Sequence, residues 1–278
     1  MQSLNRRQFK RTAAALLASG LMNTAFVGSE PSQTKQKKRR TKKGICGKGL
    51  RCPAVNASWY YNWVTSPSGK FDGQNEVEFV PMFKHGWDVT KKNLNKVEAL
   101  KTSHNVSHVL GFNEPDSKKQ GNVTVKKALE LWPKLVELDL RLGSPAVTDN
   151  ARGKAWFNQF MQQAKRRKFK IDFICLHLYP NIKNQNSVNQ FMRKIAHMYE
   201  AYKLPIWITE FSLLNFGSKD RNMTALDNLK FMKLVLPYLN KLNYVERYSW
   251  FSGNIAAMFK GPVKENNLTQ LGKQYQSL

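Results

Sequence analysis

The stretch Val109-Leu110-Gly111-Phe112-Asn113-Glu114-Pro115-Asp116 decides how the rest of this chain is interpreted. An apolar run ends abruptly at Asn-Glu-Pro-Asp. Pro115 cannot donate to a sheet ladder, and it pushes the residue before it towards extended backbone. The pattern therefore predicts a buried strand whose carboxyl end presents Asn113 and Glu114 side by side.

A second stretch, Pro205 to Phe211, has the same arrangement: an apolar strand runs into Glu210. A single glutamate after a strand is usually the solvated start of a loop. Here, however, Glu210 sits within an apolar run, and only 19 of the 278 residues are acidic. A charge in such a place must be paired, hydrogen-bonded or functional. We therefore treat Glu114 and Glu210 as a pair.

Strand-like and helix-like segments alternate through the body of the chain. The predicted strands are residues 58–63, 77–83, 108–113, 141–146, 171–179, 205–211 and 245–251, and the predicted helices are 89–100, 123–136, 155–168, 187–202 and 225–240. Such alternation implies parallel pairing. Seven strands in unbroken succession favour a (β/α)8 TIM-type barrel with one irregular strand, a single α/β catalytic domain over residues 45–278. An open doubly wound sheet is the rival, but no glycine-rich fingerprint follows the first strand.

The first 44 residues differ from the body in composition. Residues 1–29 combine a basic region, a short apolar region and small residues, which is typical of an export signal. The paired Arg6 and Arg7 followed by Phe9 favour the twin-arginine type, with a Sec signal or an amphipathic helix as alternatives. Residues 30–44 are rich in Lys and Arg and are interpreted as a disordered basic linker that adheres to anionic envelope polymers. The protein is therefore expected in the periplasm or outside a bacterial cell.

Composition sets further limits. The chain holds 45 Lys and Arg and has a net charge of +26, which suits an anionic environment or ligand without naming it. The body has no run of eighteen apolar residues, so no transmembrane segment is expected. Of the three cysteines, Cys46 and Cys52 are close enough in sequence for a disulfide, which stays an open question, and Cys175 is interpreted as core packing. Too few cysteines remain for a zinc site.

Two carboxylates among aromatic residues at strand ends suggest glycoside hydrolysis. A retaining enzyme needs one carboxyl group to protonate the leaving oxygen and another, about 5 Å away, to attack the anomeric carbon. Flat aromatic rings suit the apolar faces of sugars. The candidate substrate-binding residues are Tyr61, Trp63, Asn113, His177, Tyr179 and Trp250. For most aromatic residues core packing is the competing interpretation, and a structural role for His177 stays open.

Seven segments in order carry a resemblance to a known family: Trp59 to Trp63, Glu78 to Met82, Leu110 to Asp116, Arg141 to Ala146, Asp172 to Tyr179, Ile206 to Phe211 and Arg247 to Phe251. Together they resemble glycoside hydrolase family 128, over roughly residues 55 to 252. The resemblance implies a (β/α)8 barrel and a retaining endo-β-1,3-glucanase without a metal or organic cofactor.

Carried onto this sequence, the resemblance makes Glu114 the acid/base and Glu210 the nucleophile. Asn113, Tyr179 and Trp250 would surround the sugar at the cleavage point, and Trp63 would be an aromatic platform. The chain departs from the family at Met82-Phe83-Lys84, where a tryptophan often follows Pro-Met, and this leaves endo or exo action open.

Three functions are compatible with these features. The first is an exported monomeric enzyme acting on β-glucan. The second is a non-catalytic carbohydrate-binding or surface-attachment protein on the same barrel. The third, a nucleic-acid or anionic-polymer binder, explains the basic charge but leaves the paired glutamates unexplained, so no nucleic-acid partner is expected.

Overall fold

The structure is a computed structural model that describes residues 42–68, 77–180, 185–216 and 222–278. All of these residues belong to one compact unit. The predicted export signal and residues 30–41 of the predicted linker lie outside the described residues. Within the described part, none of the helices combines the length and the apolar character needed to cross a membrane.

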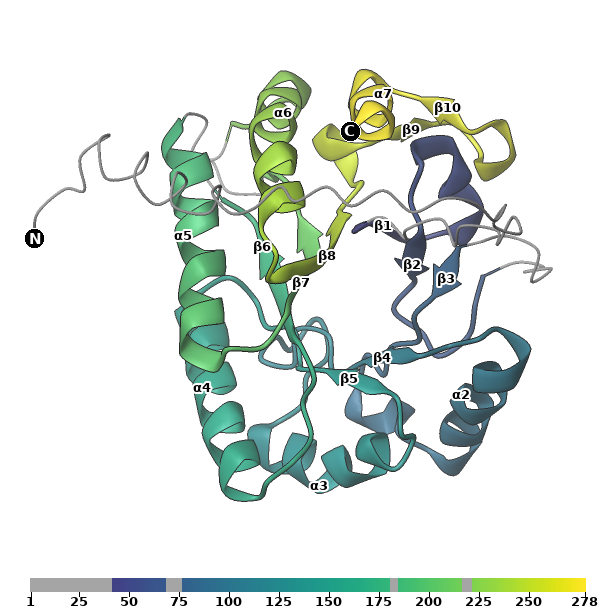
Figure 1. Cartoon of the computed structure of the whole chain (residues 1–278), viewed down its shortest axis with the longest axis vertical. Coiled ribbons are helices and arrows are strands. Elements are labelled where there is room, and N and C mark those ends of the chain that lie inside the picture. Colours follow the sequence, from purple (N-terminus) through teal and green to yellow (C-terminus); the bar gives the residue numbers. More distant parts are fainter. Residues whose placement is uncertain (1–41, 69–76, 181–184, 217–221) are drawn as a thin grey trace, which may run out of the picture. The chain divides into compact units, whose positions relative to one another are not determined.

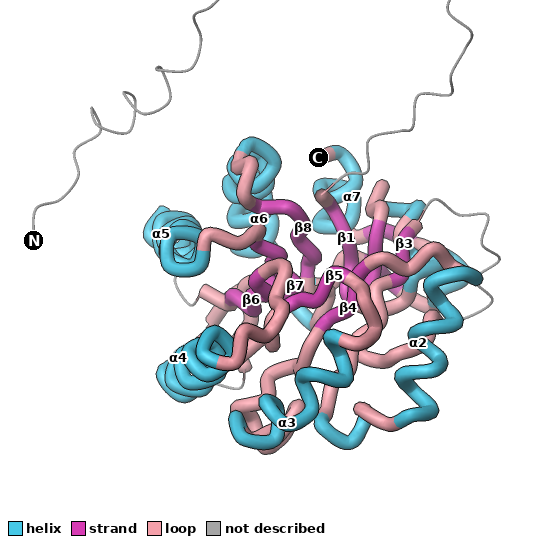
Figure 2. The backbone as a smooth tube through the Cα atoms, turned by 60° about the horizontal axis from the view of Figure 1, so that its bottom comes forward, coloured by secondary structure: helices cyan, strands magenta, loops and turns pink. Residues whose placement is uncertain are grey.

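Parallel strands form the centre of the fold and helices surround them, as Figures 1 and 2 show. The central strands are β1 Lys43–Cys46, β2 Trp59–Tyr61, β3 Glu78–Phe79, β4 His108–Leu110, β5 Arg141–Gly143, β6 Ile174–Leu178, β7 Ile206–Phe211 and β8 Val245–Trp250. Six pair in the order β3-β2-β1-β8-β7-β6, and β4 pairs with β5. Parallel bridges Met82–Leu110 and Gly143–Phe173 connect the two groups. The strand order thus runs around a ring, and the predicted TIM-type barrel is confirmed.

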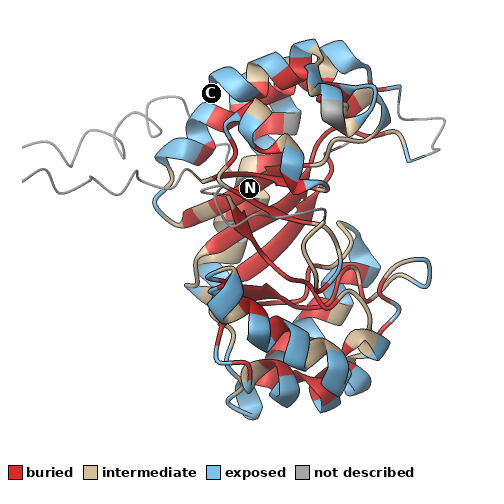
Figure 3. Cartoon of the chain, turned by 90° about the vertical axis from the view of Figure 1, so that its right-hand side faces the viewer, coloured by how far each residue is buried: buried red, intermediate tan, exposed pale blue. Residues whose placement is uncertain are grey.

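The helices lie outside the strands and expose one face each (Figure 3). They are α2 Lys91–Ser103, α3 Val125–Val136, α4 Ala151–Arg166, α5 Gln185–Tyr202, α6 Ala225–Lys241 and α7 Gln270–Ser277. Thr124 caps the start of α3, because its side chain accepts a hydrogen bond from the Lys127 amide at 3.2 Å. Two short strands, β9 Phe259–Lys260 and β10 Asn267–Leu268, pair with each other between β8 and α7.

Alternation along the strands separates two apolar cores. In β2, Trp59 and Tyr61 join an inner cluster that also contains Cys175 and Trp207, whereas Tyr60 joins the larger layer between strands and helices. Successive side chains of a strand point to opposite faces, so one strand supplies both cores. The predicted packing role of Cys175 is confirmed by its place in the inner cluster.

The strand missing from the sequence analysis is β1, which begins at Lys43, inside the predicted linker. Lys43 is buried, and its Nζ donates to the Tyr275 carbonyl of α7 at 2.7 Å. Burial lowers the pKa of Lys43 to about 8. Next to it, a Cβ on Gly44 would lie 2.2 Å from the Trp59 indole, so only glycine fits there. In the sequence, Lys43 cannot be told apart from the lysines before it, because its carbonyl acceptor lies far away in the chain.

The disulfide left open between Cys46 and Cys52 is not formed, because all three cysteines are free and buried. The Cys46 thiol lies 3.3 Å from the Trp250 carbonyl, and the Cys52 thiol lies 3.7 Å from the Trp59 carbonyl. Each thiol thus has a separate backbone acceptor. Burial raises the pKa of both groups, which keeps them protonated.

Charged residues from the first positions of several strands meet inside the barrel, at the end opposite the predicted site. Glu78 of β3 accepts from Arg247 of β8 and lies 2.7 Å from the Nδ1 of His108 in β4. Arg141 of β5 binds Glu246 of β8 through two hydrogen bonds of 2.5 and 2.9 Å. The buried charge of Glu78 is thereby paired, whereas the side chains of Arg141 and Glu246 stay 38% and 33% exposed.

Stability at acid pH should depend on Glu78. Burial raises the pKa of Glu78, but the hydrogen bond with His108 and the charge of Arg247 outweigh it and hold the pKa at about 2, against 4.5 for the free side chain. Since the folded-state pKa is the lower one, the stabilisation is complete above pH 4.5 and is lost as the pH falls towards 2. Breaking a buried pair by removing one partner costs about 3 kcal/mol or more.

We expect Glu78→Gln to lower the free energy of unfolding by about 3 kcal/mol at pH 7, with the difference from wild type shrinking as the pH is lowered from 4.5 towards 2. Urea denaturation at a series of pH values measures both effects. Glu137→Gln, which removes an exposed carboxylate at the end of α3, is the matched control. A constant difference across the pH series would mean that Glu78 is not ionised in the folded protein.

Candidate active site

The carboxyl ends of the strands bring Glu114 and Glu210 together, as the sequence predicts. An oxygen of Glu114, an oxygen of Glu210 and a ring nitrogen of His177 all lie within 4.8 Å of one another. Glu114 follows β4, His177 lies in β6 and Glu210 lies in β7. Three residues far apart in sequence therefore form one cluster at one end of the barrel.

Three hydrogen-bond donors surround the Glu210 carboxylate. Tyr61 and Trp63 donate to its Oε1, each at 2.9 Å, and Tyr179 donates to its Oε2. Hydrogen bonds to a carboxylate favour its ionised form. Burial, and then the charge of Glu210, raise the pKa of both tyrosines well above the ordinary value, so the phenols remain donors. The site thus directs three donors at the Glu210 carboxylate.

His177 lies between the two glutamates. Its Nδ1 is 3.1 Å from Glu114 and its Nε2 is 3.5 Å from Glu210. Burial lowers the pKa of His177, but the negative charges of Glu210 and Glu114 and the hydrogen bond with Glu114 outweigh burial, so the pKa is raised. His177 and Tyr179, two residues apart, both reach Glu210, as the two-residue period of a strand predicts.

Glutamate and histidine are also metal ligands, and within the described residues these three are the only group with suitable geometry. The oxygens of Glu210 already accept hydrogen bonds from Tyr61, Trp63 and Tyr179. A cation bound here would have to share those oxygens with three hydrogen-bond donors. The arrangement is better suited to acid/base and nucleophilic chemistry at the carboxylates.

A shift in strand register directs Glu210 into the barrel. Trp207 packs in the inner cluster, while Ile208 and Phe211 both pack in the outer layer. Strict alternation would send Ile208 and Glu210 to the same face. The pairing of β7 with β8 shifts register between Ile208 and Phe211, so Glu210 turns inwards. Bulges of this kind re-aim side chains and are frequent next to active sites.

Unusual backbone conformations position two further site residues. Glu114 has a φ of 41° and Trp63 a φ of 57°, in the left-handed region that non-glycine residues seldom adopt. The Glu114 amide donates to the Ala146 carbonyl at 2.6 Å, which holds that conformation. Beside it, Asn113 is 3% exposed, and its Oδ1 is buried without a hydrogen-bond partner within the described residues. This unpaired acceptor is available to a ligand.

The structure corrects the prediction for Trp250 and replaces it with its neighbour. The Trp250 side chain has no exposed surface, donates to the Ala256 carbonyl and packs on Phe231 of α6 in the outer layer. Phe251 instead lies among the site residues, with ring centroids 6.2 Å from Trp63 and 5.9 Å from Tyr179. A shift of one residue along a strand changes the face, and the two-residue period of β8 was the signal that could have identified Phe251.

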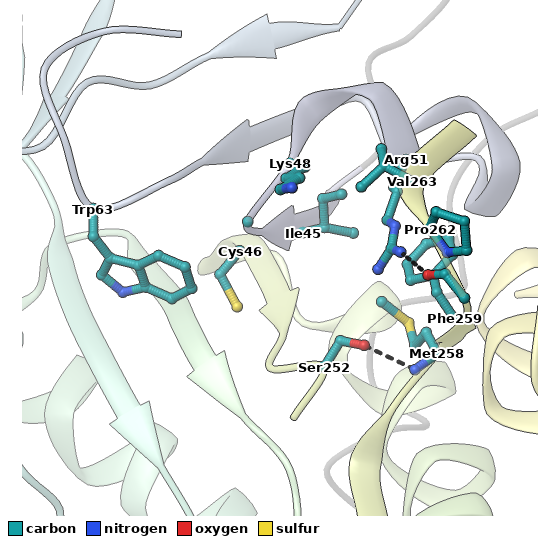
Figure 4. Close-up of a pocket in the computed structure, with 12 residues that line it drawn as sticks. Ile45, Cys46, Lys48, Arg51, Trp63, Ser252, Met258, Phe259, Pro262 and Val263 are labelled. Carbon is teal, nitrogen blue, oxygen red and sulfur yellow. Dashed lines mark hydrogen bonds between the residues drawn. The ribbon is translucent and has the colours of Figure 1, made fainter. Parts of the chain in front are cut away.

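Two recesses open beside this cluster. One, with a cavity volume of about 510 Å³, begins at Trp63 and Cys46 and extends between the segment after β1 and Met258 to Val263; Figure 4 shows Trp63 at its edge. The other, of about 350 Å³, is lined by Phe216, Phe251 and Asn254. Two recesses that adjoin an aromatic cluster suit the binding of an extended ligand.

The proton affinity of His177 should depend on Glu114. Because Glu114 contributes to the raised pKa of His177, we expect Glu114→Gln to lower that pKa. NMR titration of the imidazole resonances would show the shift, with His197, exposed on α5, as the reference. An unchanged titration of His177 in the variant would contradict the contact between the two side chains.

Known proteins resemble this chain over most of its length. The family model described as glycosyl hydrolase catalytic core matches residues 47–275. Alkali-sensitive linkage protein 1 of Schizosaccharomyces pombe is 32% identical over 207 residues, which cover 70% of this chain and 34% of that protein. The chain therefore spans about a third of the length of that curated relative.

Some solved structures match this chain over nearly their whole length. An endo-β-1,3-glucanase of family 128, subgroup I, from Amycolatopsis mediterranei, in complex with laminaripentaose, is 31% identical with a TM-score of 0.77, covering 85% of this chain and 99% of that one. A subgroup II endo-β-1,3-glucanase from Sorangium cellulosum, 23% identical with a TM-score of 0.70 and covering 84% and 97%, has the same fold. From the family match over residues 47–275 and the relative matched along almost its whole length, this chain belongs to glycoside hydrolase family 128.

Proposed function

We propose that this chain is an exported, retaining endo-β-1,3-glucanase in which Glu210 is the nucleophile and Glu114 is the acid/base. The observation that carries the proposal is the approach of the two carboxylates, with oxygens within 4.8 Å. Retaining glycosidases hold their carboxyl groups about 5 Å apart, whereas inverting enzymes leave room for a water molecule between them. The β-1,3-linkage rests on the similarity to the Amycolatopsis glucanase and its laminaripentaose complex.

The first step of the proposed mechanism forms a covalent intermediate. The Glu210 carboxylate, which accepts hydrogen bonds from Tyr61, Trp63 and Tyr179, attacks the anomeric carbon. The bond from that carbon to the glycosidic oxygen breaks, and protonated Glu114 gives its proton to the leaving oxygen. The free Oδ1 of Asn113 accepts a hydrogen bond from the hydroxyl next to the reacting carbon, an interaction that fills its unpaired position.

The second step releases the sugar. Glu114, now ionised, takes a proton from a water molecule, whose oxygen attacks the anomeric carbon and displaces Glu210. His177 contacts both carboxylates, so its raised pKa lets it hold a positive charge between them as the negative charge passes from one to the other. Two inversions at the anomeric carbon return the β configuration.

We expect Glu114→Gln and Glu210→Gln each to lower kcat/KM on a soluble β-1,3-glucan by about 10³-fold or more, because each removes a group that acts on the reacting atoms. Release of reducing ends measures the rate, and proton NMR of the first product identifies its anomer. Glu137→Gln is the control for the loss of one carboxylate.

Rescue with azide separates the two roles. With an activated aryl β-glucoside, Glu114→Ala should form a β-glucosyl azide and Glu210→Ala an α-glucosyl azide, since azide replaces the acid/base-assisted water in one case and the nucleophile in the other. A first product of α configuration from wild type would contradict retention. Glucan that is bound but left intact by wild type would favour the surface-binding function instead.

Export is proposed from residues 1–29, with the periplasm or the cell exterior as the destination. A reporter that must fold before export, fused behind residues 1–44, should leave the cytoplasm of a bacterium with a twin-arginine system. Changing Arg6 and Arg7 together to Lys should abolish this export, whereas changing Lys37 and Lys38 to Arg should not. If the unchanged signal fails to export this reporter but exports a reporter that crosses the membrane unfolded, the signal is of the Sec type.

A further inference from the structure

Trp87 is the most exposed of the large hydrophobic residues that the structure describes, at 64% of its surface. It lies in the short 3-10 helix Gly86–Asp88, on the loop that follows β3 at the carboxyl end of the barrel. A single exposed hydrophobic side chain is common and needs no explanation by itself. The feature that needs an explanation is that this indole is held in a fixed position while most of its surface is exposed.

The ring of His85 fixes the indole. The two rings stack at 4.1 Å between centroids with an angle of 14° between their planes. Asp88 accepts from the His85 amide at 2.8 Å and lies 3.2 Å from its Nδ1, and the Asp88 carbonyl accepts from Asn93 of α2 at 2.8 Å. Stacking covers one face of the indole and leaves the other free. A ring ordered before binding loses little freedom when a ligand packs on it.

The loop that carries Trp87 is joined to the catalytic strand. The Lys84 carbonyl accepts from the Asn113 amide at 3.2 Å, and Asn113 directly precedes Glu114. Gly121 packs against both, because a Cβ there would lie 2.2 Å from the Asn113 carbonyl oxygen and 3.0 Å from that of Lys84. Trp87 is three residues beyond Lys84. It therefore stands at the rim of the barrel beside the strand that ends in Glu114.

The surroundings of Trp87 suit a sugar better than a protein. The other exposed large hydrophobic residues of the described chain lie on other segments: Leu50, Val64, Phe216, Leu226, Leu234, Tyr238 and Leu278. A protein partner would need a continuous apolar patch, whereas Trp87 is the one exposed large hydrophobic residue that the structure describes on this loop. A sugar ring offers one apolar face of about the size of an indole, and its hydroxyl groups can bond to polar neighbours such as Lys84 and Asp88.

We propose that Trp87 is a stacking platform for a glucose unit of a glucan chain some distance from the cleavage point, so that it gives the enzyme a preference for long chains. This inference rests on the proposed function and extends it to a specificity residue outside the catalytic cluster. Because the platform contacts neither the reacting carbon nor the glutamates, its contribution is to binding, which changes KM rather than kcat.

The test compares β-1,3-glucan oligosaccharides of increasing length. In wild type, kcat/KM should rise with length until the chain covers Trp87. In Trp87→Ala, the ratio of kcat/KM for the longest to the shortest oligosaccharide should fall about fivefold, mainly through KM. Trp87→Tyr should keep most of the ratio. Tyr238→Ala, which removes another exposed ring on α6, should keep all of it.

Binding of the same oligosaccharides to Glu210→Gln protein, with and without Trp87→Ala, gives a second readout without turnover. If Trp87→Ala leaves the ratio of affinities for the longest and shortest oligosaccharides unchanged, the proposal that Trp87 is a platform is wrong. Equal losses at every length would also overturn it, because they would mean that Trp87 only supports the loop at Asn113. If the wild-type protein neither cuts nor binds an oligosaccharide of any length, the proposed function is wrong, and the inference about Trp87 is then wrong as well.

Discussion

Charges that pair across the interior of the barrel hold its strands in place. The Arg247 side chain of β8 donates to Glu78 of β3, although β1 and β2 separate these strands in the sheet. The guanidinium also lies 4.3 Å from the Trp207 ring centroid, so it is packed as well as paired. A single unpartnered charge at this depth would be very costly. The pairing therefore favours one alignment of the strands. The same alignment sets the positions of the strand ends that carry the catalytic residues.

At the opposite end, the same strands deliver side chains whose arrangement depends on small departures from regularity. The register shift in β7 turns Glu210 towards Tyr61 and Tyr179, and the left-handed backbone at Glu114 turns its carboxylate towards His177. Regular strands would place neither group correctly. These departures cost free energy. Burial of the large apolar layers around them offsets that cost, as is usual at strained sites.

The barrel and both glutamates could be predicted from the sequence, because apolar strands that end in a charged residue give a strong local signal. Trp250 was misplaced, since the choice between it and Phe251 depends on which face of β8 turns inwards. The first strand was missed because its Lys43 resembles the charged run before it, and only the distant Tyr275 carbonyl explains its burial. Interactions between residues far apart in sequence leave no local pattern.

That contact between β1 and α7 also joins two segments that are synthesised far apart in time. Lys43 donates to the Tyr275 carbonyl, and the Tyr275 hydroxyl donates to the Gly44 carbonyl at 2.7 Å, across 231 residues of chain. During synthesis the first strand of the ring emerges early, but the helix that fastens it emerges after all the other strands. The sheet neighbour that completes the pairing of β1 is β8, so β1 lacks one partner strand until residues 245–250 have been synthesised. Until then one edge of β1 carries unpaired backbone groups, the kind of edge to which another strand can add.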